Sequence, residues 1–240
     1  MTKDRRAKRA ARERQGMSDG PYSAARRSTA WPPQMVLSID TPHHITQLLY
    51  LRTAWGLRTA IEPPKLDPLL EPGKSAAPQS ASREEWARRW DAQWALAWDW
   101  YGIEQHRAGL AGLTPDGLRE LVGDGSTLNP TIPPMWSFRY GDDGFDHEAY
   151  SAWKRTFTRI PHGRLEDQPA RRSVQAVTAA WHTGLETVIV LPYADYYAER
   201  ITARHLVVSD AVWQTTALRE QALALPAPPS GNAGVSEGDA

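Results

Sequence analysis

The sequence predicts a helix-rich α/β or α+β protein, with a small mixed sheet of about four short strands packed around a tryptophan-rich helix. In the stretch 82–101 tryptophans recur every four residues, which is typical of one face of a helix. The apolar runs 187–191 and 206–208 lack polar alternation, as expected of strands that are buried on both faces. Predicted helices precede and follow these runs, and this order favours a sheet covered by helices.

The stretch 82–101, called the tryptophan helix below, begins with a capping box. Ser82 can accept a hydrogen bond from the backbone N–H of Glu85, and Glu85 can reach back to the N–H of Ser82. Burial of its five tryptophans would contribute on the order of 25 kcal/mol before entropic costs. We therefore expect the helix to form the centre of the core. The alternative is an aromatic surface that stacks bases, sugars or a partner peptide, for which Trp86 or Trp100 is best placed.

The body of the chain opens with a strand and a helix. Residues 35–39 are predicted as a short strand, and a helix is predicted to begin at Pro42 and to end at Gly56. His43 and His44 lie in its first turn, where the helix dipole disfavours a protonated imidazole. We interpret both as neutral surface histidines, because no third residue that would complete a metal site can be identified.

Proline-rich sequence separates this helix from the tryptophan helix. Residues 62–81 predict either a hinge between two lobes or a long surface loop within one domain. Beyond the tryptophan helix, a short helix is predicted over 114–122 and a loop over 123–135.

Alternating aromatic residues predict a strand over 136–140. A turn over 141–144 follows, and then a helix that Asp146 caps and that carries Phe157. Four acids lie close together in this region: Asp142, Asp143, Asp146 and Glu148. Their spacing does not match an EF-hand loop, so we interpret them as an acidic turn and predict no metal site.

The last third of the chain has the clearest alternation of elements. The predicted order is a helix over 171–182, a strand over 187–191, a short helix over 196–201, a strand over 206–208 and a final helix over 209–223. About a dozen residues connect the two strands, which is near the minimum for a parallel pair, so parallel and antiparallel pairing both remain open.

A parallel pair would favour a ligand pocket beyond the carboxyl ends of the two strands. Four residues would then line that pocket: Tyr193, Asp195, Tyr196 and Asp210. The alternative is that the two tyrosines pack against the start of the helix predicted over 196–201, which Asp195 would cap.

The sequence carries no familiar catalytic signature. It has no phosphate-binding Gly-x-x-x-x-Gly-Lys-Ser/Thr loop, no Gly-x-Gly-x-x-Gly after a predicted strand, no nucleophile elbow and no His-Glu-x-x-His. The absence of cysteine excludes disulfides, thiolate nucleophiles, cysteine-ligated zinc and iron–sulfur clusters. His162 and His182 lie near the ends of predicted elements, and we interpret them as ordinary histidines. We therefore predict no catalytic residue, cofactor or metal.

Charge is unevenly distributed along the chain. The net charge is zero, yet residues 1–27 contain nine basic and three acidic residues, which leaves 19 basic and 25 acidic residues elsewhere. An arm with an excess of six positive charges suits phosphate backbones or an acidic protein surface, and a solubilising tail is the alternative. The candidate contact residues of this arm are Arg5, Arg6, Lys8, Arg9, Arg12, Arg14, Arg26 and Arg27.

Part of this arm resembles a known group of sequences. The pattern Ala-Arg-Glu-Arg-Gln-Gly over 11–16, followed by Tyr-Ser-Ala-Ala-Arg-Arg over 22–27, resembles a short Arg-rich N-terminal element of uncharacterised actinobacterial proteins. The stretch 181–209 is also similar to segments of such proteins. The resemblance implies no activity and no functional residues.

We expect a basic, mobile arm over 1–30, a single globular body over 31–225 and a disordered tail over 226–240. No apolar run approaches the ~18 residues of a membrane span, and the charged N-terminus lacks the apolar core of a secretory signal, so we expect a cytoplasmic protein. Our preferred hypothesis is a non-enzymatic binding protein whose arm contacts nucleic acid or an acidic partner. The alternatives are a small-ligand protein or enzyme with a pocket near Tyr193 and Asp195, and a structural subunit that docks a partner through exposed tryptophans.

Overall fold

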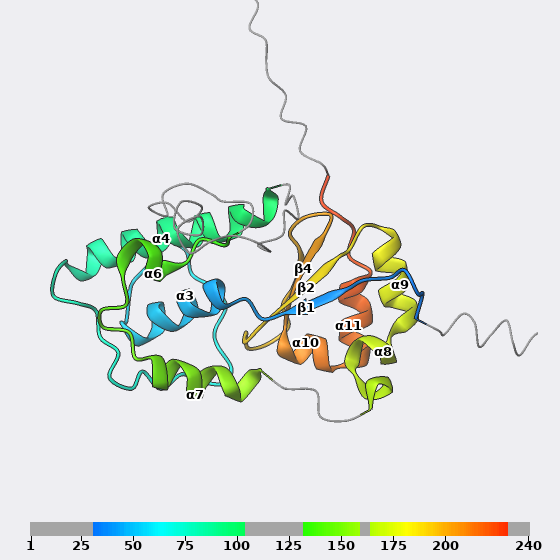
Figure 1. Ribbon diagram of the computed structural model, residues 1–240, viewed down its shortest axis with the longest axis horizontal. Coiled ribbons are helices and arrows are strands. Elements are labelled where there is room, and N and C mark those ends of the chain that lie inside the picture. The colour runs from blue at the N-terminus through cyan, green and yellow to red at the C-terminus, as the bar shows by residue number, and fades with distance from the viewer. Residues whose placement is uncertain (1–30, 104–131, 159–163, 230–240) are drawn as a thin grey trace, which may run out of the picture.

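The computed structural model describes three parts of the chain, residues 31–103, 132–158 and 164–229 (Figure 1). The basic arm, the helix predicted over 114–122, His162 and the tail from residue 230 lie outside the described residues.

Four short strands form one mixed sheet in the order β1-β2-β4-β3. Their bounds are β1 Ser38–Asp40, β2 Thr187–Leu191, β3 Ala198–Arg200 and β4 His205–Ser209. Strands β1, β2 and β4 are parallel, and β3 pairs with β4 in the antiparallel sense. The pairing of the two apolar runs, which the sequence left open, is therefore parallel, and the predicted fold class is confirmed.

Helices cover both faces of the sheet. One side carries α3 His43–Ala54, α4 Arg83–Asp99, the 3₁₀ turn η1 Trp100–Gly102, α6 Trp136–Tyr140 and α7 His147–Phe157. The other side carries η2 Leu165–Asp167, α8 Pro169–Arg172, α9 Val174–His182, α10 Asp210–Gln214 and α11 Thr216–Leu223. Figure 1 shows these two groups on opposite sides of the strands. None of the helices within the described residues is long and apolar enough to cross a membrane.

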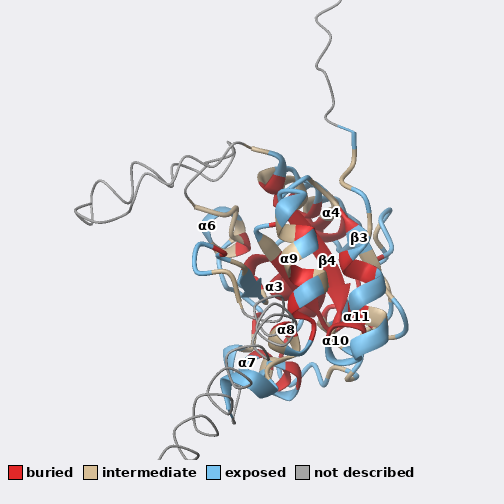
Figure 2. Ribbon diagram, turned by 90° about the vertical axis from the view of Figure 1, so that its right-hand side faces the viewer, coloured by how far each residue is buried: buried red, intermediate tan, exposed pale blue. Residues whose placement is uncertain are grey.

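The sheet separates two apolar clusters, and buried residues concentrate along the strands and the inner faces of the helices (Figure 2). Successive residues of a strand point to opposite faces. Ile189 and Val207 accordingly join the cluster that contains the tryptophan helix, whereas Val188 and Leu206 join the cluster formed with α9, α10 and α11. Both faces are therefore buried, as the apolar runs of β2 and β4 predicted.

The tryptophan helix, which comprises α4 and η1, has the central position that its sequence predicts. Ser82 accepts a hydrogen bond from the backbone N–H of Glu85 at 3.2 Å. Trp90 stacks on Trp94 with ring centroids 4.9 Å apart, and its indole N–H donates to the carbonyl of Leu48 in α3. All eleven tryptophans of the chain lie in described residues and none is exposed, so a docking surface of exposed tryptophans receives no support.

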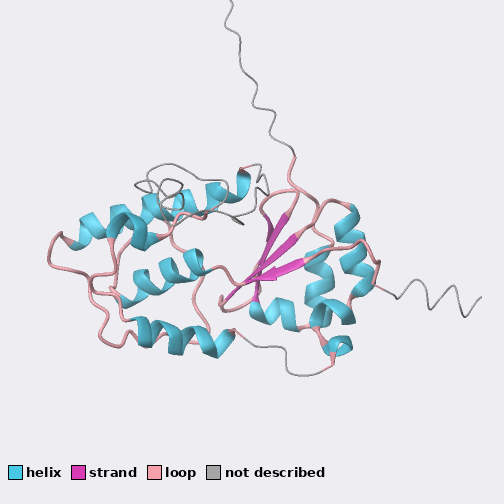
Figure 3. Ribbon diagram, viewed as in Figure 1, coloured by secondary structure: helices cyan, strands magenta, loops and turns pink. Residues whose placement is uncertain are grey.

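Two predictions of secondary structure are wrong. Residues 136–140 form the helix α6 rather than a strand (Figure 3). A strand would turn all three aromatic rings to one face. In α6, Trp136 and Tyr140 instead pair across one helical turn with centroids 4.6 Å apart, while Phe138 is 49% exposed.

The second error concerns residues 196–201, which contain β3 rather than a helix. A helix of six residues gains little from its own hydrogen bonds. The hairpin with β4 satisfies the backbone instead, for example through the bond from the N–H of Ser209 to the carbonyl of Tyr197. Asp195 therefore caps no helix there.

Residues 62–81 form a long irregular segment that is tied to the helices at many points. The hydroxyl of Tyr50 in α3 contacts both Ser75 and the carbonyl of Pro72. Asp146 caps α7 through one carboxylate oxygen and accepts the backbone N–H of Lys74 with the other. Asp146 thus links the start of α7 to this segment.

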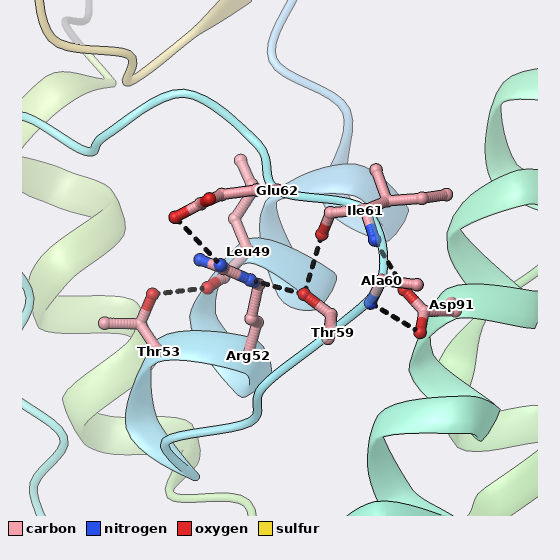
Figure 4. Close-up of polar contacts among 8 residues, drawn as sticks. All are labelled: Leu49, Arg52, Thr53, Thr59, Ala60, Ile61, Glu62 and Asp91. Carbon is pink, nitrogen blue, oxygen red and sulfur yellow. Dashed lines mark hydrogen bonds and ion pairs between the residues drawn. The ribbon is translucent and has the colours of Figure 1, made fainter.

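The turn between α3 and this segment joins α3 to α4 (Figure 4). Arg52 of α3 donates to the hydroxyl of Thr59 at 2.8 Å. Asp91 of α4 accepts the backbone N–H groups of Ala60 and Ile61. Charge-assisted hydrogen bonds to backbone groups are stronger than neutral ones, so these contacts help to fix the position of α3 relative to α4.

Candidate functional site

A cavity of about 300 Å³ lies between the sheet and the end of the tryptophan helix. Its floor is one row across three parallel strands, in which Ser38 pairs with Thr187 and Thr187 pairs with His205. Residues paired in this way project from the same face of a sheet. Two residues further along β2 and β4, the same face carries the apolar residues Ile189 and Val207. The polar row therefore marks the end of the apolar part of this face.

Helical segments form the walls of this cavity. Pro42, His43 and His44 come from the start of α3, which follows β1 directly, and Trp100 and Tyr101 come from η1. Further lining residues are Asp40, Pro133 and Met135. The aromatic rings of the tryptophan helix therefore end at a polar cavity.

His44 is the most deeply buried polar residue of the cavity, with 3% of its surface exposed. Burial, assisted by the nearby His43, lowers the pKa of His44 to about 3, so its imidazole is neutral at pH 7. Its ring lies against Trp100 and Tyr101. Among the described residues Nε2 of His44 has no hydrogen-bond partner. A buried polar atom without a partner costs roughly 1–3 kcal/mol, which a ligand could offset.

His205 opens β4 and faces Tyr101, with ring centroids 5.0 Å apart. Its Nδ1 lies 2.8 Å from the hydroxyl of Thr202. Burial lowers the pKa of His205 to about 4, and burial raises the pKa of Tyr101 above its usual range. The cavity therefore holds neutral imidazoles and a protonated phenol at pH 7.

His43 is exposed, and its Nδ1 lies 2.8 Å from the hydroxyl of Tyr150 in α7. Partial desolvation of the ring by its neighbours, together with the charge of Lys154, lowers the pKa of His43. The prediction that His43 and His44 are neutral thus agrees with the direction of both pKa shifts. The prediction that both lie on the surface is wrong for His44, because His44 shares the inner face of α3 with Leu48.

The four residues of the predicted pocket lie beyond the carboxyl ends of β2 and β4, whereas the cavity floor lies at the amino ends of these strands. Tyr193 is buried against Tyr197, whereas Asp195 and Tyr196 are exposed, and Asp210 begins α10. None of these lines the cavity described above.

Part of the irregular segment 62–81 lies beside the residues that follow β2. Leu66 forms an antiparallel bridge with Tyr193, and the N–H of Asp67 donates to the carbonyl of Pro192. The parallel pairing on which the pocket prediction depended is confirmed, while the pocket itself stays a prediction.

Sequence reasoning passed over most of the residues that form the cavity. His44 lies four residues before Leu48, and this helical spacing, which is visible in the sequence, places both residues on the inner face of α3. His205, Ser38 and Thr187 had no such signal, because only the strand register brings them together. The candidate contact residues of the basic arm lie outside the described residues.

Comparison with known proteins finds no matching family model, no matching protein among those with curated functions and no matching solved structure.

Proposed function

We propose that this protein binds a small, uncharged, partly aromatic ligand in the cavity between the sheet and η1. The observation that carries the proposal is the unpartnered Nε2 of buried His44 at the cavity wall. Native proteins rarely leave a buried polar atom without a partner unless a bound molecule or ordered water supplies one. The aromatic walls and the few convergent polar groups are typical of small-molecule sites, and the cavity volume is at the lower end of their range.

The properties of the cavity restrict the class of ligand. Its imidazoles are neutral at pH 7, and its acidic lining residue, Asp40, is exposed to solvent. A charged ligand would therefore lose much of its hydration without gaining a buried countercharge. Trp100, Tyr101 and His44 offer ring faces and edges on which a planar ligand packs. A compact planar heterocycle fits these properties best.

A ligand-observed NMR screen with neutral planar heterocycles tests this proposal. Ser38→Trp fills the cavity from its floor, and Val36→Trp is the matched control, because Val36 is 66% exposed and does not line the cavity. We expect compounds that bind the natural chain and the Val36 variant but not the Ser38 variant. Equal binding to both variants, or no binding compound at all, would contradict the proposal.

We propose as a second candidate function that the basic arm contacts nucleic acid. The supporting observation is the excess of six positive charges within residues 1–27. Each neutralised phosphate releases counterions, so affinity should fall steeply with salt concentration. We expect deletion of 1–27 to weaken binding to a DNA or RNA duplex and to flatten the salt dependence. An unchanged affinity and slope would exclude this role, and an acidic protein partner would then be the next candidate.

A further inference from the structure

Two hydrogen-bond chains begin at cavity histidines, and each fixes the position of the proton on one imidazole ring. The first chain runs from His43 through Tyr150 to Thr46. The hydroxyl of Thr46 donates to the carbonyls of Pro42 and His43, at 3.0 and 3.2 Å. A carbonyl can only accept, so the single proton of Thr46 is committed to the backbone.

The direction of the first chain follows from that bond. The hydroxyls of Tyr150 and Thr46 are 2.8 Å apart, and Thr46 has no second proton to offer, so Tyr150 donates to Thr46. Burial raises the pKa of Tyr150 to about 12, so its hydroxyl has one proton to give and gives it to Thr46. Tyr150 must then accept from Nδ1 of His43. Nε2 of His43 is left without a proton and acts as an acceptor.

The second chain has the opposite direction. The hydroxyl oxygen of Thr202 accepts the backbone N–H groups of Arg204 and His205, at 3.0 and 3.1 Å. Those two bonds use both lone pairs of the oxygen, so its own proton is donated to Nδ1 of His205 at 2.8 Å. The neutral ring of His205 then carries its proton on Nε2, which is a donor.

We infer that the cavity is a donor–acceptor site that selects uncharged ligands carrying both a hydrogen-bond donor, for Nε2 of His43, and an acceptor, for Nε2 of His205. This inference rests on the proposed function and names its ligand class, a planar heterocycle with an N–H group and an unprotonated ring nitrogen or carbonyl. Both histidines line the cavity, His43 from α3 and His205 from β4. A site whose polar groups are fixed before binding discriminates between ligands, because a mismatched ligand leaves one of these groups without its partner.

Imidazole ¹⁵N chemical shifts test the two tautomers in the full chain without any ligand. At pH 7.5 we expect a protonated, pyrrole-type Nδ1 in His43 and a protonated, pyrrole-type Nε2 in His205. In Tyr150→Phe, His43 should populate both tautomers while His205 is unchanged. In Thr202→Val, His205 should populate both tautomers while His43 is unchanged. The same tautomer in both histidines, or no response to either variant, would overturn the inference.

Three probes of nearly equal size test the ligand class by titration calorimetry or NMR. Benzimidazole carries a donor and an acceptor, 1-methylbenzimidazole only the acceptor, and indole only the donor. We expect benzimidazole to bind tightest, and each of the others to bind about 2- to 10-fold more weakly, as the loss of one hydrogen bond implies.

Variants of the two histidines should remove these preferences one at a time. In His43→Ala, benzimidazole and 1-methylbenzimidazole should bind equally, while the preference over indole persists. In His205→Phe, which keeps a ring beside Tyr101, benzimidazole and indole should bind equally. Probes that bind the natural chain with equal affinity would overturn the inference and leave the proposed function intact. Failure of all three probes, while other heterocycles bind, would overturn the ligand class alone.

Discussion

The buried histidines make the stability of this protein dependent on pH. In the unfolded chain their pKa values return to 6.5, above the folded values of about 3 for His44 and about 4 for His205. The unfolded state therefore binds more protons below pH 6.5. Stability is fully present above that pH and is lost as the pH falls toward the folded pKa values.

We expect a loss of about 2 kcal/mol per histidine between pH 7.5 and pH 5.0, since each pKa unit corresponds to about 1.4 kcal/mol. Urea denaturation at the two pH values measures it. In His44→Leu the difference between the two pH values should shrink by about half. An identical pH dependence in the variant would show that His44 is not neutral in the folded protein.

A single buried guanidinium bridges two breaks in helices that the sequence predicted as continuous. The predicted helix over 171–182 is divided at Ser173, and the final helix is divided at Thr215. Arg219 is 1% exposed and donates to the hydroxyls of Ser173 and Thr216 and to the carbonyl of Trp213. Arg219 thus contacts a hydroxyl at the first break, and a carbonyl and a hydroxyl at the second, so one side chain bridges both breaks.

Arg219→Met keeps the length of the side chain and removes these hydrogen bonds. We expect the free energy of unfolding to fall by about 2–4 kcal/mol, because buried acceptors lose their donor. Arg172→Met is the matched control, since the ion pair that Arg172 forms among the described residues is an exposed one with Asp167, and such pairs contribute about 0–1 kcal/mol. Equal effects of the two substitutions in urea denaturation would contradict this role for Arg219.

At the scale of elements, periodicity over long segments was informative and periodicity over short segments was not. The tryptophan helix and α7 have enough turns for an unambiguous pattern, and both were predicted correctly. The five residues of α6 fit both a two-residue alternation and a four-residue pair, and only the neighbouring rings of Trp55 and Trp86 decide between them. Similarly, the strand register that assembles the cavity floor is a tertiary property that no local pattern contains.

The N-terminal cap of the tryptophan helix is testable by a single substitution. Ser82→Ala removes the oxygen that accepts the N–H of Glu85, and a lost cap costs about 1 kcal/mol. Ser80→Ala is the control, because Ser80 lies exposed just before the helix. We expect thermal unfolding followed by circular dichroism to show a lower midpoint only for the Ser82 variant. A shift of equal size in both variants would assign the effect to the loop instead.

At the scale of the whole molecule, the two apolar clusters share the same strands, so they should unfold together. Ile189→Ala opens a cavity in the cluster of the tryptophan helix, and Leu206→Ala opens one on the other face. Each should cost about 2–5 kcal/mol. Among the described residues, six buried tryptophans belong to the first cluster and one to the second, so fluorescence reports mainly on the first. We expect fluorescence and far-UV circular dichroism to give coincident transitions in both variants. Separate transitions in either variant would mean that the clusters are independent.

The strand β1 is three residues long and exposed, and it lies at the edge of the sheet. It also supplies Ser38 to the cavity floor, and the N–H of Ser38 donates to the carbonyl of Glu186. A ligand that binds only when β1 is in place therefore opposes fraying of that edge. At 100 times its dissociation constant such a ligand would slow the amide hydrogen exchange of Ser38 about 100-fold. Occupancy of the cavity thus becomes measurable as protection of a backbone amide at the margin of the sheet.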